Sequence, residues 1–259
     1  MDLLGISQAK FFSFFLILLR LGGLFTFAPV YGTMMLPMRV KAAAVLGISV
    51  CLSVLGLGGP VPVPATTSGL AFFAVQEVLL GFLLGFATRL VFAAVEFGGQ
   101  LVGLQMGLGI VSILDPQFET QVSILSQLQF LLATLLFLAV GGDRMLLEAF
   151  AANLDRIPPG HLALKGPVLG ALVTLAGEIF RLGLQLSAPV VVALLATQVI
   201  LGVFARSMPQ MNMLILGFPL QILFGFGVLG FALPHWSRTL VRAFSEMFEA
   251  LRGLAALLH

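Results

Sequence analysis

Few side chains in this sequence could do chemistry, and most of them lie within apolar stretches. The charged residues inside the apolar regions are Arg20, Glu77, Arg89, Glu96, Glu178, Arg181 and Arg206. A charge at the centre of a bilayer costs about 3 kcal/mol on insertion scales, so each of these groups needs a partner, a cavity or an interface. Buried carboxylates such as Glu77 and Glu96 serve in proton relays or pair with cations between helices, and we favour pairing. Glu178 and Arg181 are three residues apart and can pair within one helix.

No catalytic, metal-binding or nucleic-acid-binding arrangement is recognisable. Ser-His and His-Glu-x-x-His arrangements are absent, and the three histidines, His161, His235 and His259, lie in expected linker or tail sequence. The single cysteine, Cys51, excludes an intramolecular disulfide and a multi-cysteine metal site. No cluster of Lys and Arg offers a surface for nucleic acid. We therefore expect a protein that is not an enzyme, needs no cofactor or metal and does not bind nucleic acid.

The composition is that of an integral membrane protein or of a subunit buried in a membrane assembly. Of the 259 residues, 59% are hydrophobic and only 9% are charged, whereas a soluble domain has about 25% charged residues. The mean hydropathy is +1.12. The net charge is only +2, so the sequence pI near 9.1 reflects a lack of charges rather than a basic surface. We expect an all-α fold of membrane-type helices.

The apolar runs predict a series of helices separated by two linkers. The expected helices cover residues 11–30, 40–57, 69–95, 97–113, 121–141, 167–205 and 211–234. The linkers are the proline-rich run 58–64 and the more polar stretch 153–167, because repeated proline removes backbone donors. The second linker divides shorter, glycine-interrupted helices from one hairpin of two long helices.

The last 25 residues form an amphipathic tail. Phe244, Met247, Phe248 and Leu251 lie on one face of a helix, and Arg and Glu residues lie on another. This pattern is typical of a helix at a membrane interface. A solvated helix end is the alternative.

A polar heptapeptide, Arg206 to Asn212, stands between two long uncharged stretches, 182–205 and 207–237. Each stretch can cross a bilayer core, which needs about 20 apolar residues. Pro209, in the middle of the heptapeptide, ends one helix before the next begins. The heptapeptide therefore reads as the tip of a helical hairpin whose polar groups face a partner.

The glycine-rich run at 97–116 has two interpretations. Gly99, Gly103 and Gly107 recur at every fourth position, which places small residues on one helix face and lets helices approach closely. Yet Gly107 and Gly109, followed by Asp115-Pro116, argue for irregular backbone, which at membrane depth is tolerated only where protein buries it or it lines a cavity. We expect a non-helical apolar loop from about Met106 to Asp115.

These motifs, in this order, resemble the FliR family, the flagellar biosynthesis proteins of the bacterial type III export gate. The resemblance is carried by Leu19-Arg20, Ala28-Pro29-Val30 and Leu36-Pro37-Met38-Arg39-Val40-Lys41, by Gly81, Gly85, Glu96, Gly99, Gly103-Leu104-Gln105-Met106-Gly107 and Asp115-Pro116, and by Ala188-Pro189, Arg206, Pro209-Gln210-Met211-Asn212 and Gly217-Phe218-Pro219. It runs over nearly the whole chain. One departure is Gly141-Gly142-Asp143, where members often have Gly-His.

The resemblance implies an architecture and a set of partners. Residues 1–160 would form a FliP-like helical half that contains a pore plug, and residues 161–259 a FliQ-like helical hairpin with the amphipathic tail. The chain would assemble with FliP-like, FliQ-like and FlhB-like subunits in the bacterial inner (cytoplasmic) membrane at the flagellar basal body, with part of the assembly above the membrane plane. Unfolded export substrates would pass through the pore.

The resemblance also implies two groups of site residues. The pore plug would consist of Met106, Gly107, Gly109, Ile110, Val111, Ile113, Leu114, Asp115 and Pro116. The subunit contacts would involve Arg206, Pro209, Gln210, Asn212, Glu96 and Gln105. Apolar plug side chains would resist water and ions by dewetting, and the glycines would supply backbone freedom.

Two alternatives to a flagellar export subunit remain at this point. A secondary transporter of a small solute also uses broken helices near the membrane midplane, although no matched pair of broken segments is visible in two halves. The equivalent subunit of a virulence type III secretion system would carry the same motifs.

Overall fold

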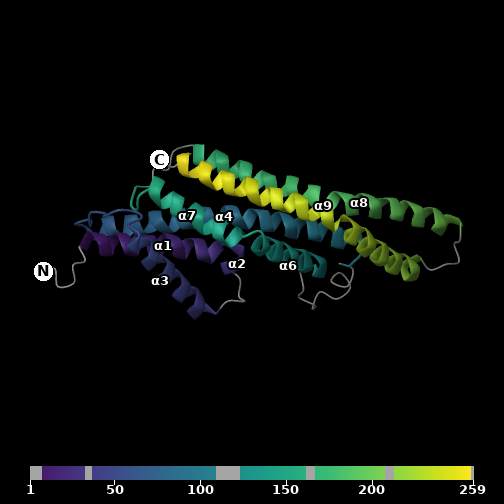
Figure 1. Ribbon diagram of the computed structural model, residues 1–259. Helices are drawn as coiled ribbons and strands as arrows, with labels where there is room; N and C mark the ends of the chain where they lie inside the picture. The colour runs from purple at the N-terminus through teal and green to yellow at the C-terminus, as the bar shows by residue number, and fades with distance from the viewer. Residues whose placement is uncertain (1–7, 33–36, 109–122, 162–166, 208–212, 258–259) are drawn as a thin grey trace. The chain divides into compact units, whose positions relative to one another are not determined.

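The computed structural model describes residues 8–32, 37–108, 123–161, 167–207 and 213–257 (Figure 1). The helices are α1 Gln8–Phe27, α2 Pro29–Gly32, α3 Met38–Val54, α4 Thr67–Gln105, α6 Ile124–Ala139, α7 Gly142–Arg156, α8 Pro167–Ser207 and α9 Met213–Leu257. Within the described ranges there is no strand. The expected all-α fold is confirmed.

Two predicted helix boundaries are wrong. The expected helices 69–95 and 97–113 form one helix, Thr67–Gln105, because Gly98 and Gly99 keep helical backbone and pack against neighbouring chain. The expected helix 211–234 and the amphipathic tail also form one helix, Met213–Leu257, with two prolines inside it. The tail's apolar face is buried within the protein and is therefore not left for a membrane surface or for solvent.

One helix was not expected at all. The segment Gly142–Arg156 is helical although its apolar residues are interrupted by charges. Its buried positions, Leu146, Ala149, Phe150 and Leu154, recur at helical spacing. The linker expected at 153–167 therefore begins only after Arg156, whereas the proline-rich linker at 58–64 has no helix, as expected.

The chain divides into two compact units that do not follow its order. The first unit comprises Met1–Leu90, Gly141–Leu175 and Ser245–His259, and the second comprises Val91–Val140 and Ala176–Phe244. The division into a FliP-like half and a FliQ-like hairpin at about residue 160 rests on the resemblance and stays a prediction.

In the first unit, α1 and α4 cross at backbone contact. A Cβ added to Gly81 would lie 1.9 Å from the carbonyl oxygen of Arg20, and one added to Gly85 would lie 2.8 Å from that of Leu24. Small residues thus allow this close approach. Leu16, Leu21 and Leu24 on α1 are fully buried beside the crossing.

In the second unit, an aromatic cluster joins three helices. The ring centroid of Phe92 on α4 lies 5.5 Å from that of Phe130 and 5.7 Å from that of Phe137, both on α6. It lies 5.6 Å from the ring centroid of Phe244 on α9. Phe137 and Phe244 are also in edge contact at 5.2 Å. Such pairs add to the free energy of apolar burial.

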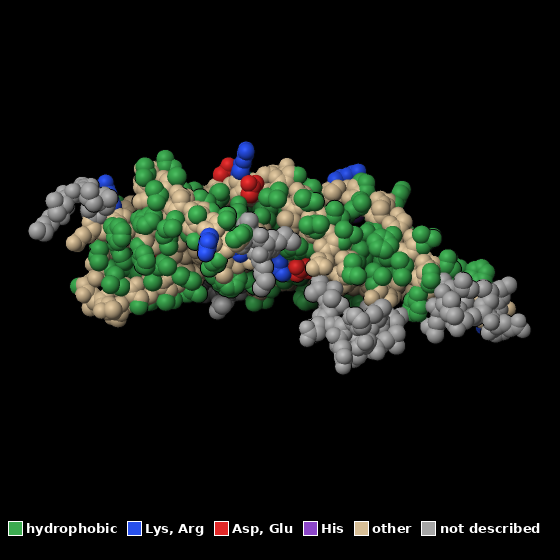
Figure 2. Space-filling model, turned by 90° about the horizontal axis from the view of Figure 1, so that it is seen from below, with side chains coloured by type: hydrophobic (Ala, Val, Ile, Leu, Met, Phe, Trp, Pro, Cys, Tyr) green, Lys and Arg blue, Asp and Glu red, His purple; other side chains and the backbone are tan. Residues whose placement is uncertain are grey.

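The helices are those of a membrane protein. Four described segments are long and apolar enough to cross a bilayer, namely Gln8–Phe27, Thr67–Gln105, Ala176–Ser207 and Gly217–Arg252, and the bent pair α6 and α7 would make a fifth. In the most apolar 18-residue stretch of each of the last two segments, only 11% and 6% is buried within the protein. The corresponding share for Thr67–Gln105 is 61%. Hydrophobic side chains also dominate the face drawn in Figure 2. The hairpin therefore offers apolar surface to lipid or to other subunits.

Candidate functional site

A buried ion pair organises the first unit. Arg20 on α1 and Glu77 on α4 are both fully buried, and Arg20 donates from Nε and Nη2 to the two carboxylate oxygens of Glu77 at 2.5 and 3.0 Å. The Nη1 group of Arg20 donates to Asn153 Oδ1 at 3.1 Å and to the carbonyl oxygen of Ile157 at 2.9 Å. The backbone N–H of Gly160 donates to Glu77 Oε1 at 2.8 Å. The pair therefore connects α1, α4, α7 and the turn after α7.

The structure shows contacts of several charged residues that the sequence left open. The pairing interpretation of Glu77 is confirmed, because three donors surround its carboxylate. Arg181 and Glu178 form the expected pair within α8, with about half of each side chain exposed. Glu96 is partly buried, and its backbone carbonyl accepts a hydrogen bond from Ser126 Oγ on α6 at 2.9 Å.

The C-terminal end of α4 is closed by a glycine cap. Gly107 has φ +77°, a left-handed conformation that favours glycine. Its N–H donates to the carbonyl oxygen of Leu104, and the N–H of Leu108 donates to that of Gly103, both at 3.0 Å. This is the Schellman arrangement, which ends a helix and satisfies its last carbonyls. The helix expected over 97–113 stops at Gln105 for this reason.

Met106 anchors that helix end in the core of the second unit. The side chain is fully buried and clusters with Val102, Leu125, Val190 and Leu194, and Leu108 packs against the same cluster. Gly225 on α9 leaves room for the Met106 side chain, because a Cβ at Gly225 would lie 2.7 Å from Met106 Cγ.

The expected non-helical loop is described only at its start. Met106, Gly107 and Leu108 form a turn after α4. The other expected plug residues, Gly109, Ile110, Val111, Ile113, Leu114, Asp115 and Pro116, lie outside the described residues. Their role as a plug stays a prediction.

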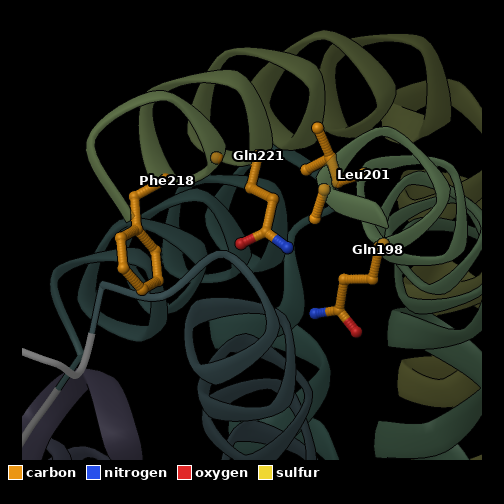
Figure 3. A pocket seen from close by; sticks show the side chains of 7 residues that line it. Gln198, Leu201, Phe218 and Gln221 are labelled. Carbon is orange, nitrogen blue, oxygen red and sulfur yellow. The ribbon is translucent and has the colours of Figure 1, made fainter. Parts of the chain in front are cut away.

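Next to this anchor, polar side chains from three helices lie within apolar surroundings. Gln198 Nε2 on α8 donates to Gln105 Oε1 on α4 at 2.9 Å. Gln198 also lines a pocket of about 260 Å³ between α8 and α9, together with Leu201, Gly202, Ala205, Gly217, Phe218 and Gln221. Figure 3 shows the side-chain amides of Gln198 and Gln221 directed into the space between the two helices. The pocket has no charged lining residue.

The sequence interpretation did not single out Gln198 and Gln221. The available signal was that each is an isolated amide in a stretch without charge. Gln105, expected to contact another subunit, accepts a hydrogen bond from Gln198 within the chain, and its role in a subunit contact stays a prediction. Arg206 is exposed at the end of α8, whereas Pro209, Gln210 and Asn212 lie outside the described residues.

The described residues contain no cluster of three or more His, Cys, Asp or Glu side chains that could hold a metal ion. The described site offers neutral side-chain amides, apolar packing and one buried ion pair.

Comparisons with known proteins agree on one protein family. The sequence profile of the family described as "Bacterial export proteins, family 1" matches residues 11–247. The chain is 31% identical over 237 residues to the flagellar biosynthetic protein FliR of Escherichia coli (strain K12), covering 92% of this chain and 90% of that protein. It is 31% identical over 227 residues to FliR of Aquifex aeolicus, covering 87% and 86%, and 28% identical over 253 residues to FliR of Bacillus subtilis, covering 95% of each chain.

Proposed function

The chain belongs to the bacterial export proteins of family 1, and on this premise we propose that the end of α4 holds a plug in the pore of a protein export gate. The membership confirms the expected function, that of a FliR-like core subunit of the flagellar type III export gate. The three relatives compared above are named flagellar biosynthetic proteins, which favours a flagellar role over that of a solute transporter or a virulence system.

The observation that carries the plug proposal is the anchored and capped end of α4. Met106 fixes the helix end in a packed core, and Gly107 turns the chain out of the helix immediately before the apolar residues of the expected plug. A rigid anchor lets the following segment occupy one place in a closed gate. Ile110, Val111 and Ile113 would then fill the pore until an unfolded substrate displaces them, because an apolar constriction resists water and ions.

The apolar hairpin supports the proposal of partner subunits. On α8 and α9, Val199, Phe231 and Leu223 are 69%, 90% and 72% exposed. Exposed apolar patches of this kind mark interfaces with protein or lipid. We place FliP-like and FliQ-like subunits on this surface, a FlhB-like subunit at the hairpin tip near Arg206, and the whole assembly in the bacterial inner membrane at the flagellar basal body.

Co-expression tests this assignment. The chain should co-purify with FliP-like and FliQ-like subunits from detergent and should behave poorly when expressed alone. A monodisperse monomer that transports a small solute by itself would contradict the proposal. Within the plug, replacing Ile110 and Ile113 with Ala should give a small ion leak in assembled gates. The exposed Leu104→Ala variant, in the last turn of α4, serves as the matched control.

A further inference from the structure

We propose that the pocket between α8 and α9 binds the extended main chain of the exported polypeptide through the side-chain amides of Gln198 and Gln221. This proposal rests on the proposed export function. It concerns how the gate contacts its substrate, which neither the plug nor the subunit contacts explain.

The chemistry of the pocket selects a neutral amide ligand. The side-chain amide of Gln221 offers one acceptor and two donor hydrogens, and Gln198 offers an acceptor oxygen beside the NH2 group that donates to Gln105. A peptide unit requires the same kinds of group. None of the described lining residues is charged, so these residues favour a neutral ligand over an ionic one. The other lining residues are apolar or lack a side chain, and they would accept substrate side chains of many kinds.

Hydrogen-bonding requirements favour an extended ligand backbone over a helical one. In a helix, nearly all backbone N–H and C=O groups are already paired within the helix, so a packing helix has little use for two facing amides. An extended chain has unpaired groups that need partners when they leave water. Neutral amides can therefore bind an unfolded substrate at any position along its sequence.

The pocket also has room for a chain. Among the described residues, a Cβ added to Gly202 would meet no atom within 4 Å, and one added to Gly217 would meet only Leu201 Cδ1 at 4.0 Å. Phe218 adds an apolar ring beside Gln221 (Figure 3). Filling this space from Gly202 would block a ligand without displacing the protein's own atoms.

The Gln198–Gln105 hydrogen bond connects the pocket to the end of α4. Gln105 immediately precedes the anchor Met106 and the cap Gly107. A substrate amide that binds Gln198 would compete with Gln105 for the same donor group.

Substitutions test recognition in the assembled gate. Gln221→Met keeps the side-chain size but removes the amide, and it should lower the export rate about fivefold, as the net contribution of one hydrogen bond implies. Gly202→Val should lower export similarly by filling the pocket. The matched control is Gln185→Met, an exposed glutamine on α8 outside the pocket. Normal export in both pocket variants, at normal complex yield, would overturn the proposal.

Cross-linking gives a readout that does not depend on rate. In a Cys51→Ser background, Gln221→Cys should form a disulfide with cysteines placed along an export substrate that is stalled by a fused folded domain. The control Leu223→Cys, two residues away and 72% exposed, should not. Cross-links from Leu223→Cys alone would overturn the proposal.

The two proposals can fail separately. If plug variants do not leak but Gln221→Cys still cross-links to substrate, the pocket proposal stands and the plug proposal fails. If the plug variants leak but Gln221→Cys captures no stalled substrate, only the pocket proposal fails.

Discussion

The buried pair of Arg20 and Glu77 makes the first unit sensitive to single substitutions. Arg20→Met leaves the Glu77 carboxylate with only the Gly160 N–H among its three described donors, and Glu77→Gln leaves the guanidinium without its counter-charge. Breaking a buried pair in this way costs about 3–5 kcal/mol. That is a large part of a typical stability of about 5–15 kcal/mol. With about 2–4 °C per kcal/mol for a chain of this size, each single variant should lower the thermal midpoint by about 10 °C.

The double variant distinguishes the interaction between the two charges from the effect of their surroundings. Arg20→Met combined with Glu77→Gln removes both charges, so it should recover a large part of the loss caused by either single variant. The assay is the amount of intact, monodisperse gate complex that remains after heating in detergent. Glu178→Gln, which breaks the half-exposed pair on α8, is the matched control and should shift the midpoint by about 4 °C at most. Single variants with unchanged midpoints, or a double variant no better than the worse single, would refute the reasoning.

Three further substitutions probe the helix crossing, the cap and the hairpin tip. Gly81→Ala should strongly reduce complex yield, because its Cβ would lie 1.9 Å from the carbonyl oxygen of Arg20. The control is Gly47→Ala, at an open position on α3. Equal yields of the two variants would contradict the close helix crossing. Gly107→Ala should cost about 1–2 kcal/mol at φ +77°, seen as a lower thermal midpoint of the complex, and an unchanged midpoint would argue against the cap. Arg206→Ala should reduce export by weakening assembly by about 1–3 kcal/mol, and normal export with normal complex yield would reject a subunit contact there.

The sequence predicted the helical class and most of the helices because apolar runs of membrane length are a strong signal. It failed at Gly98-Gly99, where two adjacent glycines look like a break but serve as a packing surface: a Cβ on Gly98 would lie 2.9 Å from the carbonyl oxygen of Gly183. It also failed at Gly142–Arg156, where charges on one helix face hide the apolar face that is buried. In both cases the deciding contact comes from chain far away in sequence.

The site was only partly predictable for the same reason. Glu77 could be marked as a buried carboxylate, but its partner Arg20 lies 57 positions earlier in the chain. The Gly107 cap was foreseeable, since glycine commonly follows the last helical turn. The Gln105–Gln198 hydrogen bond joins residues 93 positions apart, and no periodicity along the chain indicates such a contact.

The most direct test of the export-gate account is ion conductance in cells that express the chain without residues 108–113, measured together with the yield of the assembled complex. A plug held by Met106 and Gly107 predicts that the deletion leaves the complex assembled, because Met106 and Gly107 themselves remain, and that the membrane becomes leaky to small ions and solutes. Assembled complexes without an added leak would contradict the plug. Loss of assembly would instead show that the segment serves only to pack helices together.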